Sequence, residues 1–92
     1  MASSPELGAA PAFANGVRLR AERDGSALLL VPEGIVRLNA TAAATLALVD
    51  GRRSVAEIVA ALAGARYDAD AARIEADVRA LFARLRERHL LR

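Results

Sequence analysis

The chain has 92 residues, which is enough for one domain with one modest hydrophobic core. It contains no cysteine, which excludes a disulfide framework, a thiolate nucleophile and a thiolate metal site. Its 13 basic residues, all arginine, face 11 acidic ones, so the net charge of +2 does not by itself indicate a nucleic-acid partner.

The N-terminal segment, residues 1–16, holds proline and glycine among small residues without a period of a strand or a helix. This composition predicts a flexible tail or linker, followed by a folded domain at residues 17–92. No signal peptide and no apolar run of about 18 residues is evident, so we expect a cytoplasmic protein without a membrane partner.

Three short strands are predicted in the first half of the domain. Apolar and charged residues alternate over residues 17–22, and a second apolar run covers residues 27–31. The turn signal Asp24-Gly25-Ser26 joins these two segments, and Pro32-Glu33-Gly34 leads into a third strand at residues 35–38. The pattern predicts an antiparallel meander.

Two helices are predicted next. Asn39 is placed to cap a helix over residues 40–49, whose apolar composition indicates burial. Ser54 and Glu57 have the spacing of a capping box at the start of a second helix over residues 55–63.

A third helix is predicted over residues 70–88, with Asp68 or Asp70 as its cap. Its apolar face consists of Ile74, Val78, Leu81, Phe82 and Leu85. Three antiparallel strands followed by three helices give an α+β fold, an order that winged-helix proteins also have.

The chain is poor in groups that carry catalysis. His89 stands alone in the last turn of the third helix, and no set of residues with the spacing of metal ligands accompanies it. The acidic residues near the start of that helix suit caps and an ion pair of Glu75 with Arg79 better than a calcium loop. We therefore expect no enzyme activity, no metal and no cofactor.

Arginines gather toward the end of the third helix, at Arg79, Arg84, Arg86, Arg88 and Arg92. One interpretation is that these arginines stabilise the negative end of the helix dipole. The other is that they attract an acidic peptide or an acidic protein surface, and the pattern leaves both open. DNA binding by a winged helix is a rival hypothesis, but acidic residues at the start of the helix would face phosphates unfavourably.

The third strand, Ile35-Val36-Arg37-Leu38, is last in the meander and is therefore predicted to be an edge. An ordinary short edge protected by Arg37 is one interpretation. The other is strand addition, in which a partner peptide pairs with the edge and places side chains against the apolar face of the third helix.

Four segments stand out for their combined residues: Leu-Leu-Leu-Val-Pro-Glu-Gly at 28–34, Ile-Val-Arg-Leu-Asn at 35–39, Asp-Gly-Arg-Arg-Ser-Val-Ala-Glu-Ile at 50–58, and the final Leu90-Leu91. Together they resemble the PqqD family of pyrroloquinoline quinone (PQQ) biosynthesis. The family often has an aromatic residue and a cysteine where this chain has Ala27 and Val49. These departures leave open a recognition domain for a different modified peptide.

The resemblance implies the winged-helix-like fold called the RiPP recognition element and the role of a peptide chaperone. Such a domain delivers the ribosomal precursor peptide of PQQ to a radical SAM enzyme, holding it as a strand added to the third strand. The peptide-binding residues implied here are Ile35, Val36, Arg37, Leu38, Ile74, Val78, Leu81, Phe82 and Leu85. Arg79, Arg84 and Arg86 are candidates for docking the partner enzyme.

Overall fold

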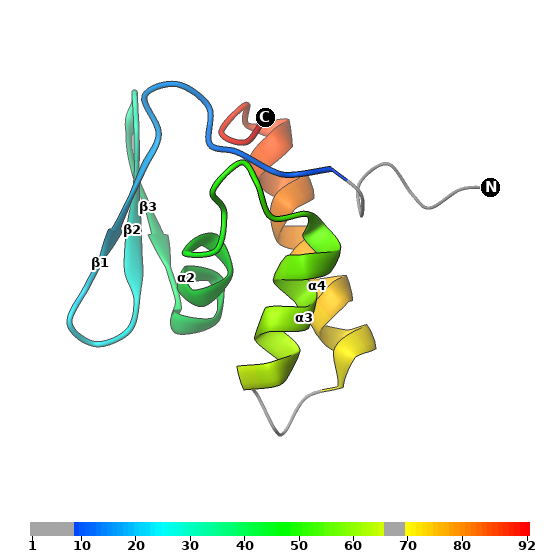
Figure 1. The fold of residues 1–92 in the computed structure, drawn as a ribbon. Helices are drawn as coiled ribbons and strands as arrows, with labels where there is room; N and C mark the ends of the chain where they lie inside the picture. Colours follow the sequence, from blue (N-terminus) through cyan, green and yellow to red (C-terminus); the bar gives the residue numbers. More distant parts are fainter. Residues whose placement is uncertain (1–8, 66–69) are drawn as a thin grey trace.

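The computed structural model describes residues 9–65 and 70–92. It confirms three antiparallel strands followed by three helices (Figure 1). The strands are β1 (Arg18–Ala21), β2 (Ala27–Val31) and β3 (Gly34–Leu38), and the helices are α2 (Ala40–Leu46), α3 (Val55–Ala65) and α4 (Ala71–Glu87). None of these helices is long and apolar enough to cross a membrane.

The sheet has the strand order β1-β2-β3, so β2 is central and β3 is an edge. Leu29 on β2 is registered with Leu19 on β1 and Val36 on β3. The turn between β1 and β2 is formed as its residues predict, because Gly25 has φ +91° and Ser26 N–H donates to Asp24 Oδ1 at 3.0 Å.

The predicted helix caps are present. Asn39 Oδ1 accepts from Ala42 N–H at 2.9 Å, and Asp70 Oδ1 accepts from Arg73 N–H at 2.8 Å. Asp68, the alternative cap, lies outside the described residues. The first helix is shorter than predicted and ends at Leu46.

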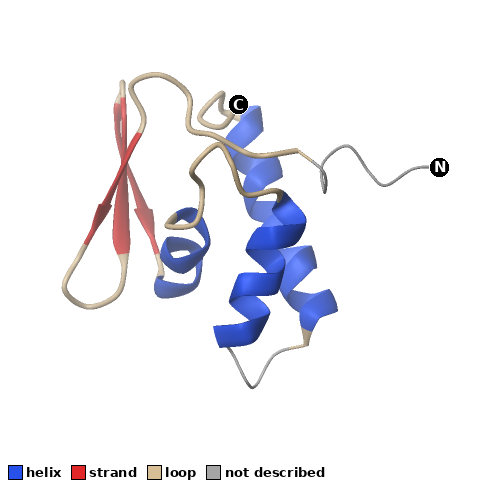
Figure 2. Ribbon diagram, viewed as in Figure 1, coloured by secondary structure: helices blue, strands red, loops and turns tan. Residues whose placement is uncertain are grey.

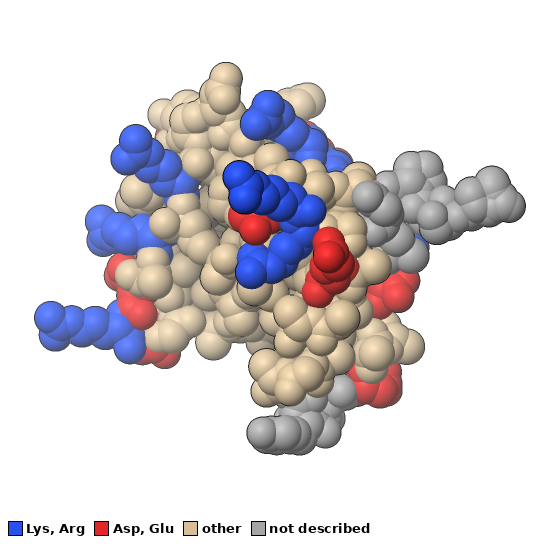
Figure 3. All heavy atoms as spheres, in the orientation of Figure 1, with Lys and Arg blue, Asp and Glu red and all other residues tan. Residues whose placement is uncertain are grey.

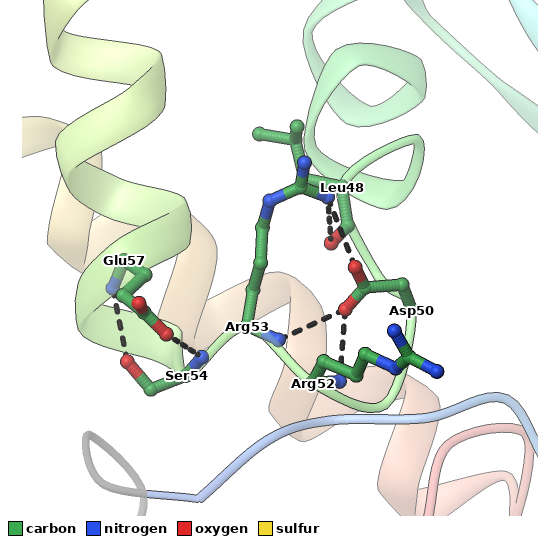
Figure 4. A network of polar contacts seen from close by, with 6 residues as sticks. All are labelled: Leu48, Asp50, Arg52, Arg53, Ser54 and Glu57. Carbon is green, nitrogen blue, oxygen red and sulfur yellow. Dashed lines mark hydrogen bonds and ion pairs between the residues drawn. The ribbon is translucent and has the colours of Figure 1, made fainter.

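The capping box of α3 is also confirmed, and Figure 4 shows its two reciprocal bonds. Ser54 N–H donates to Glu57 Oε1 at 2.8 Å, and Glu57 N–H donates to Ser54 Oγ at 3.1 Å. In the preceding loop, Asp50 Oδ1 accepts from the N–H groups of Arg53 and Arg52. Both bonds stabilise the ionised carboxylate and hold the pKa of Asp50 below its usual value, and the bond from Arg53 has the larger effect.

The helices cover one face of the sheet and leave the other face uncovered (Figure 2). The core between the sheet and the helices contains Leu29, Leu46, Ile58, Ile74 and Phe82, each at most 2% exposed. Large apolar side chains from β2 and all three helices meet in this one core, as expected for a domain of this size.

Residues 9–16, predicted as part of a flexible tail, are instead packed against the domain. Pro11 is buried, and Phe13 pairs with Leu91 in an isolated β-bridge. The carbonyls of Ala9 and Pro11 accept from the N–H groups of Val55 and Gly51. The ordered domain therefore begins before residue 17. The sequence pattern did not indicate this, because residues 9–16 pair with distant segments and form no helix or strand of their own.

The C-terminal residues turn back over the core at the end of α4. His89 has φ +60°, its N–H donates to the Arg86 carbonyl at 2.9 Å, and Leu90 N–H donates to the Leu85 carbonyl at 2.9 Å. This is the Schellman arrangement, with histidine at the left-handed position that glycine usually takes. Leu90 and Leu91 are buried as a result.

Candidate functional site

The β1–β2 turn shows which backbone groups of β2 face β1. Glu22 N–H donates to the Ser26 carbonyl at 2.9 Å, next to the first registered pair of the two strands. Hydrogen-bonded pairs alternate with non-bonded pairs along an antiparallel ladder. Leu28 and Leu30 therefore direct their backbone groups to β1, and Leu29 directs its own to β3.

The same alternation decides which backbone groups of β3 are open. Val36 and Leu38 are registered with Leu29 and Ala27, so their N–H and carbonyl groups bond to β2. The N–H and carbonyl groups of Ile35 and Arg37 point away from the sheet. Among the described residues, no backbone group outside the sheet bonds to Ile35 or Arg37. The outer edge of β3 therefore offers two unpaired donors and two unpaired acceptors for a further strand.

A groove of about 270 Å³ lies between β3 and α4. Its apolar lining comes from Val36 and Leu38 on β3, Ala42 on α2, and Leu81 and Leu85 on α4. The remaining lining residues are polar or charged: Arg37, Asn39, Arg84 and Arg88. An added strand would thus find backbone partners on β3 and side-chain contacts on α4.

The residues predicted to bind a peptide separate into two groups. Leu81 and Leu85 line the groove together with the second half of β3. Ile74, Val78 and Phe82 lie in the core, each at most 2% exposed, and none of them lines the groove. Leu81 and Leu85 also belong to the core, at 8% and 4% exposed, so they contribute both to the core and to the groove lining, whereas the other three contribute to the core without lining the groove.

Ile35 lies on the other side of the sheet from the groove. Its side chain is 61% exposed and is registered beside Leu30, whose neighbour on β1 is Arg18. The backbone of Ile35 therefore belongs to the open edge, whereas its side chain faces away from α4.

The three arginines proposed for docking an enzyme also separate. Arg84 lines the groove, whereas Arg79 and Arg86 line a hollow of about 440 Å³ on another face of α4, with Val55 and Phe82. Arg79 forms the predicted ion pair with Glu75, with an N···O distance of 3.1 Å. Helical spacing explains the division, because residues 79 and 86 are seven apart and share a face that residue 84 does not.

Sequence reasoning missed three residues that line the groove: Asn39, Ala42 and Arg88. Arg88 was available from the pattern, because it is one turn beyond Arg84 on the same helix face. Asn39 and Ala42 belong to α2 and its cap, which the sequence predicted only as a buried helix.

The groove lining contains neither histidine nor a carboxylate. His89 is exposed and lies beyond the end of α4, outside the groove lining. Within residues 9–65 and 70–92, no three His, Cys, Asp or Glu side chains are close enough together to hold a metal ion. The site presents the open backbone groups of β3, the apolar side chains that line the groove, and guanidinium groups.

The sequence was compared with protein families and with known proteins. The family model described as coenzyme PQQ synthesis protein D (PqqD) matches residues 26–91. A protein of Xanthomonas oryzae pv. oryzae (strain KACC10331 / KXO85), named PqqA binding protein, is 47% identical over 83 residues, which are 89% of each chain.

Two solved structures share the fold. The solution structure of the PqqD truncation of Methylobacterium extorquens PqqCD, described as a functional and stand-alone RiPP recognition element, has a TM-score of 0.76 and 38% identity, covering 96% of this chain and 97% of that one. TbiB1 in complex with the TbiA(beta) leader peptide has a TM-score of 0.73 and covers 87% of this chain and 93% of that one. At 24% identity, the likeness to TbiB1 shows the fold alone.

Proposed function

The chain belongs to the family of coenzyme PQQ synthesis protein D, and we propose that it is a non-catalytic chaperone that binds the precursor peptide of PQQ. The open edge of β3 beside the α4 groove is the observation that carries this proposal. The relative named PqqA binding protein and the solved recognition element support it.

In the proposed complex the precursor is an extended strand paired with β3. Its backbone bonds to the outward N–H and carbonyl groups of Ile35 and Arg37, and alternate side chains enter the groove. Inside the groove they contact Leu81 and Leu85 of α4. Backbone pairing supplies affinity and the groove supplies selectivity, which is how strand addition works elsewhere.

A backbone amide NMR titration with the precursor peptide tests this proposal. We expect saturable shifts at Ile35 and Arg37, and at the α4 residues around Leu81 and Leu85. Glu57 on α3 is exposed and does not line the groove, so it serves as the internal reference and should shift little. Shifts confined to residues away from β3 and α4 would contradict the site, and the absence of shifts at high peptide excess would contradict the function for this precursor.

We also propose that the chain presents the bound precursor to the radical SAM enzyme of the pathway. Arg79 and Arg86 line a hollow on a face of α4 apart from the groove, so an enzyme docked there would leave the peptide in place. Arg84 lines the groove and is therefore assigned to the peptide instead.

A modification assay tests this second step. The purified enzyme should modify free precursor slowly and modify it faster when the chain is added. The double variant Arg79→Glu/Arg86→Glu should bind the peptide as the parent does but lose most of this stimulation. Equal stimulation by the variant and the parent would show that the enzyme docks elsewhere.

A further inference from the structure

The lining of the groove is basic. Arg84 and Arg88 at the C-terminal end of α4 contribute guanidinium groups, and no acidic residue lines the same groove. Arg37 of β3 also lines the groove, but its side chain shares the sheet face of Ile35, which is directed away from α4. These three side chains are exposed, and none of them takes part in the ion pairs found among the described residues. Other arginines of the domain do have carboxylate partners, as Arg53 has in Asp50 and Arg79 in Glu75.

This concentration is not a consequence of the overall charge. The whole chain carries a net charge of only +2, because acidic residues nearly balance the arginines. Figure 3 shows basic and acidic side chains interspersed on the visible surface. A groove lined by two guanidinium groups and no carboxylate, with Arg37 on the adjoining edge, therefore has a local field that favours negative charge.

The groove continues along α4 into a second hollow of about 340 Å³, which shares Asn39, Ala42, Leu81 and Arg84 with it. Its other end contains Asp77 and the hydroxyl residues Thr41 and Thr45. Positive charge is thus confined to the end of the groove near Arg84 and Arg88. A ligand that fits this field carries its negative charge at one end.

The spacing of two arginines matches that of an extended peptide. Arg84 and Arg88 are one turn apart, about 6 Å along the helix axis. Side chains two residues apart in a strand lie on the same face and are about 6.6 Å apart. Carboxylates at alternate positions of a strand added to β3 therefore match the spacing of the two guanidinium groups, whereas carboxylates at adjacent positions would face opposite sides of the sheet.

We propose that the groove selects an acidic segment of the bound peptide, with carboxylates at alternate positions meeting Arg84 and Arg88. This inference rests on the proposed function, because it assigns the chemistry of the peptide that β3 binds. The methylene groups of such side chains cover Leu81 and Leu85, while their carboxylates pair with Arg84 and Arg88. Arg37, on the same edge, favours a further acidic residue on the outward-facing side of the added strand.

Charge reversal on neighbouring residues of α4 provides a matched test. Arg84→Glu and Arg88→Glu reverse charges in the groove, and Arg86→Glu reverses a charge on the other face of the same helix. We expect each groove variant to weaken binding of the precursor peptide by about threefold to tenfold at low salt, because an exposed attraction becomes a repulsion. The loss should shrink at high salt, and Arg86→Glu should change the affinity less than about twofold.

Three outcomes of that experiment are decisive. Weaker binding only for the groove variants supports the inference, provided that amide spectra show all variants to be folded. Equal losses of affinity for all three variants would show that only the net charge of the domain matters, which would overturn the inference. Unchanged affinity for every variant would also overturn it, while leaving the proposed function intact.

A pair of synthetic 12-residue peptides separates this inference from the proposed function. The two peptides have the same composition, with two glutamates either at alternate or at adjacent positions. The comparison is made in the Arg37→Ala domain, because Arg37 would attract the outward-facing glutamate of the adjacent peptide. There the alternate peptide should bind more tightly, and the difference should vanish when Arg84→Glu and Arg88→Glu are added. If the precursor fails to bind, the proposed function fails for it, and equal binding of the two peptides would overturn the charge inference on its own.

Discussion

Replacing Arg37 with proline should weaken peptide binding without destabilising the domain. The Arg37 N–H points away from β2, so proline removes a donor from the open edge and none from the sheet. A hydrogen bond of this kind contributes about 0.5–1.5 kcal/mol, which corresponds to about a 2- to 12-fold loss of affinity. Arg37→Ala is the control, since it removes the guanidinium but keeps the N–H.

Val36→Pro is the complementary variant. The Val36 N–H bonds to β2 opposite Leu29, so proline there breaks a ladder bond beside a side chain that is fully buried. We expect a clearly lower unfolding temperature for Val36→Pro and a nearly unchanged one for Arg37→Pro. Calorimetry gives the unfolding temperatures, and fluorescence anisotropy with a labelled precursor gives the affinities.

Two results would refute the assignment of backbone directions in β3. If Arg37→Pro binds the peptide as tightly as Arg37→Ala, then the Arg37 N–H makes no bond to the peptide. If Arg37→Pro is as destabilised as Val36→Pro, then that N–H belongs to the sheet.

Three further predictions concern the stability of the scaffold. His89→Gly should stabilise the domain by about 0.5–1 kcal/mol, because the relief of left-handed strain exceeds the added freedom of the unfolded chain, whereas His89→Ala should give no such gain in denaturant titrations. A chain beginning at residue 17 should be less stable than one beginning at residue 9 by on the order of 2 kcal/mol, since it loses a buried proline and several backbone hydrogen bonds to the segment around Gly51 and Val55 and to the C-terminal residues, and equal urea midpoints would contradict this. Because the pKa of Asp50 is lowered in the folded state, its ionised carboxylate stabilises the fold at pH values above the ordinary pKa of 3.8, and this stabilisation is lost as the pH falls through the lower folded value. Asp50→Asn should therefore lose less stability on acidification than the parent does.

Local signals in the sequence were sufficient for most of the scaffold. The capping box at Ser54 and Glu57 and the cap at Asn39 involve residues three apart, and each formed as predicted. Alternation and turn residues likewise placed the three strands to within a residue or two. These features depend on neighbours along the chain, so a single sequence contains the information.

Long-range pairing was not available from the sequence. Phe13 meets Leu91 across nearly the whole chain, and nothing in the pattern of residues 9–16 indicates that pairing. The apolar face of α4 was predicted correctly, but a periodic pattern does not say which of its members line a groove and which fill the core. That division depends on where β3 lies, and it assigns Leu81 and Leu85 to the groove and Phe82 to the core.

The C-terminal turn connects this scaffold to the site. Leu85 in the last turn of α4 and Arg88 at its C-cap both line the groove, just before the chain reverses at His89. Leu90 and Leu91 are held there by Ala14 N–H, which donates to the Leu90 carbonyl at 3.0 Å, and by the bridge to Phe13. Loss of these contacts would free the last turn of α4 from the core. The position of Arg88 relative to β3, and with it the basic end of the groove, therefore depends on the pairing of the two ends of the chain.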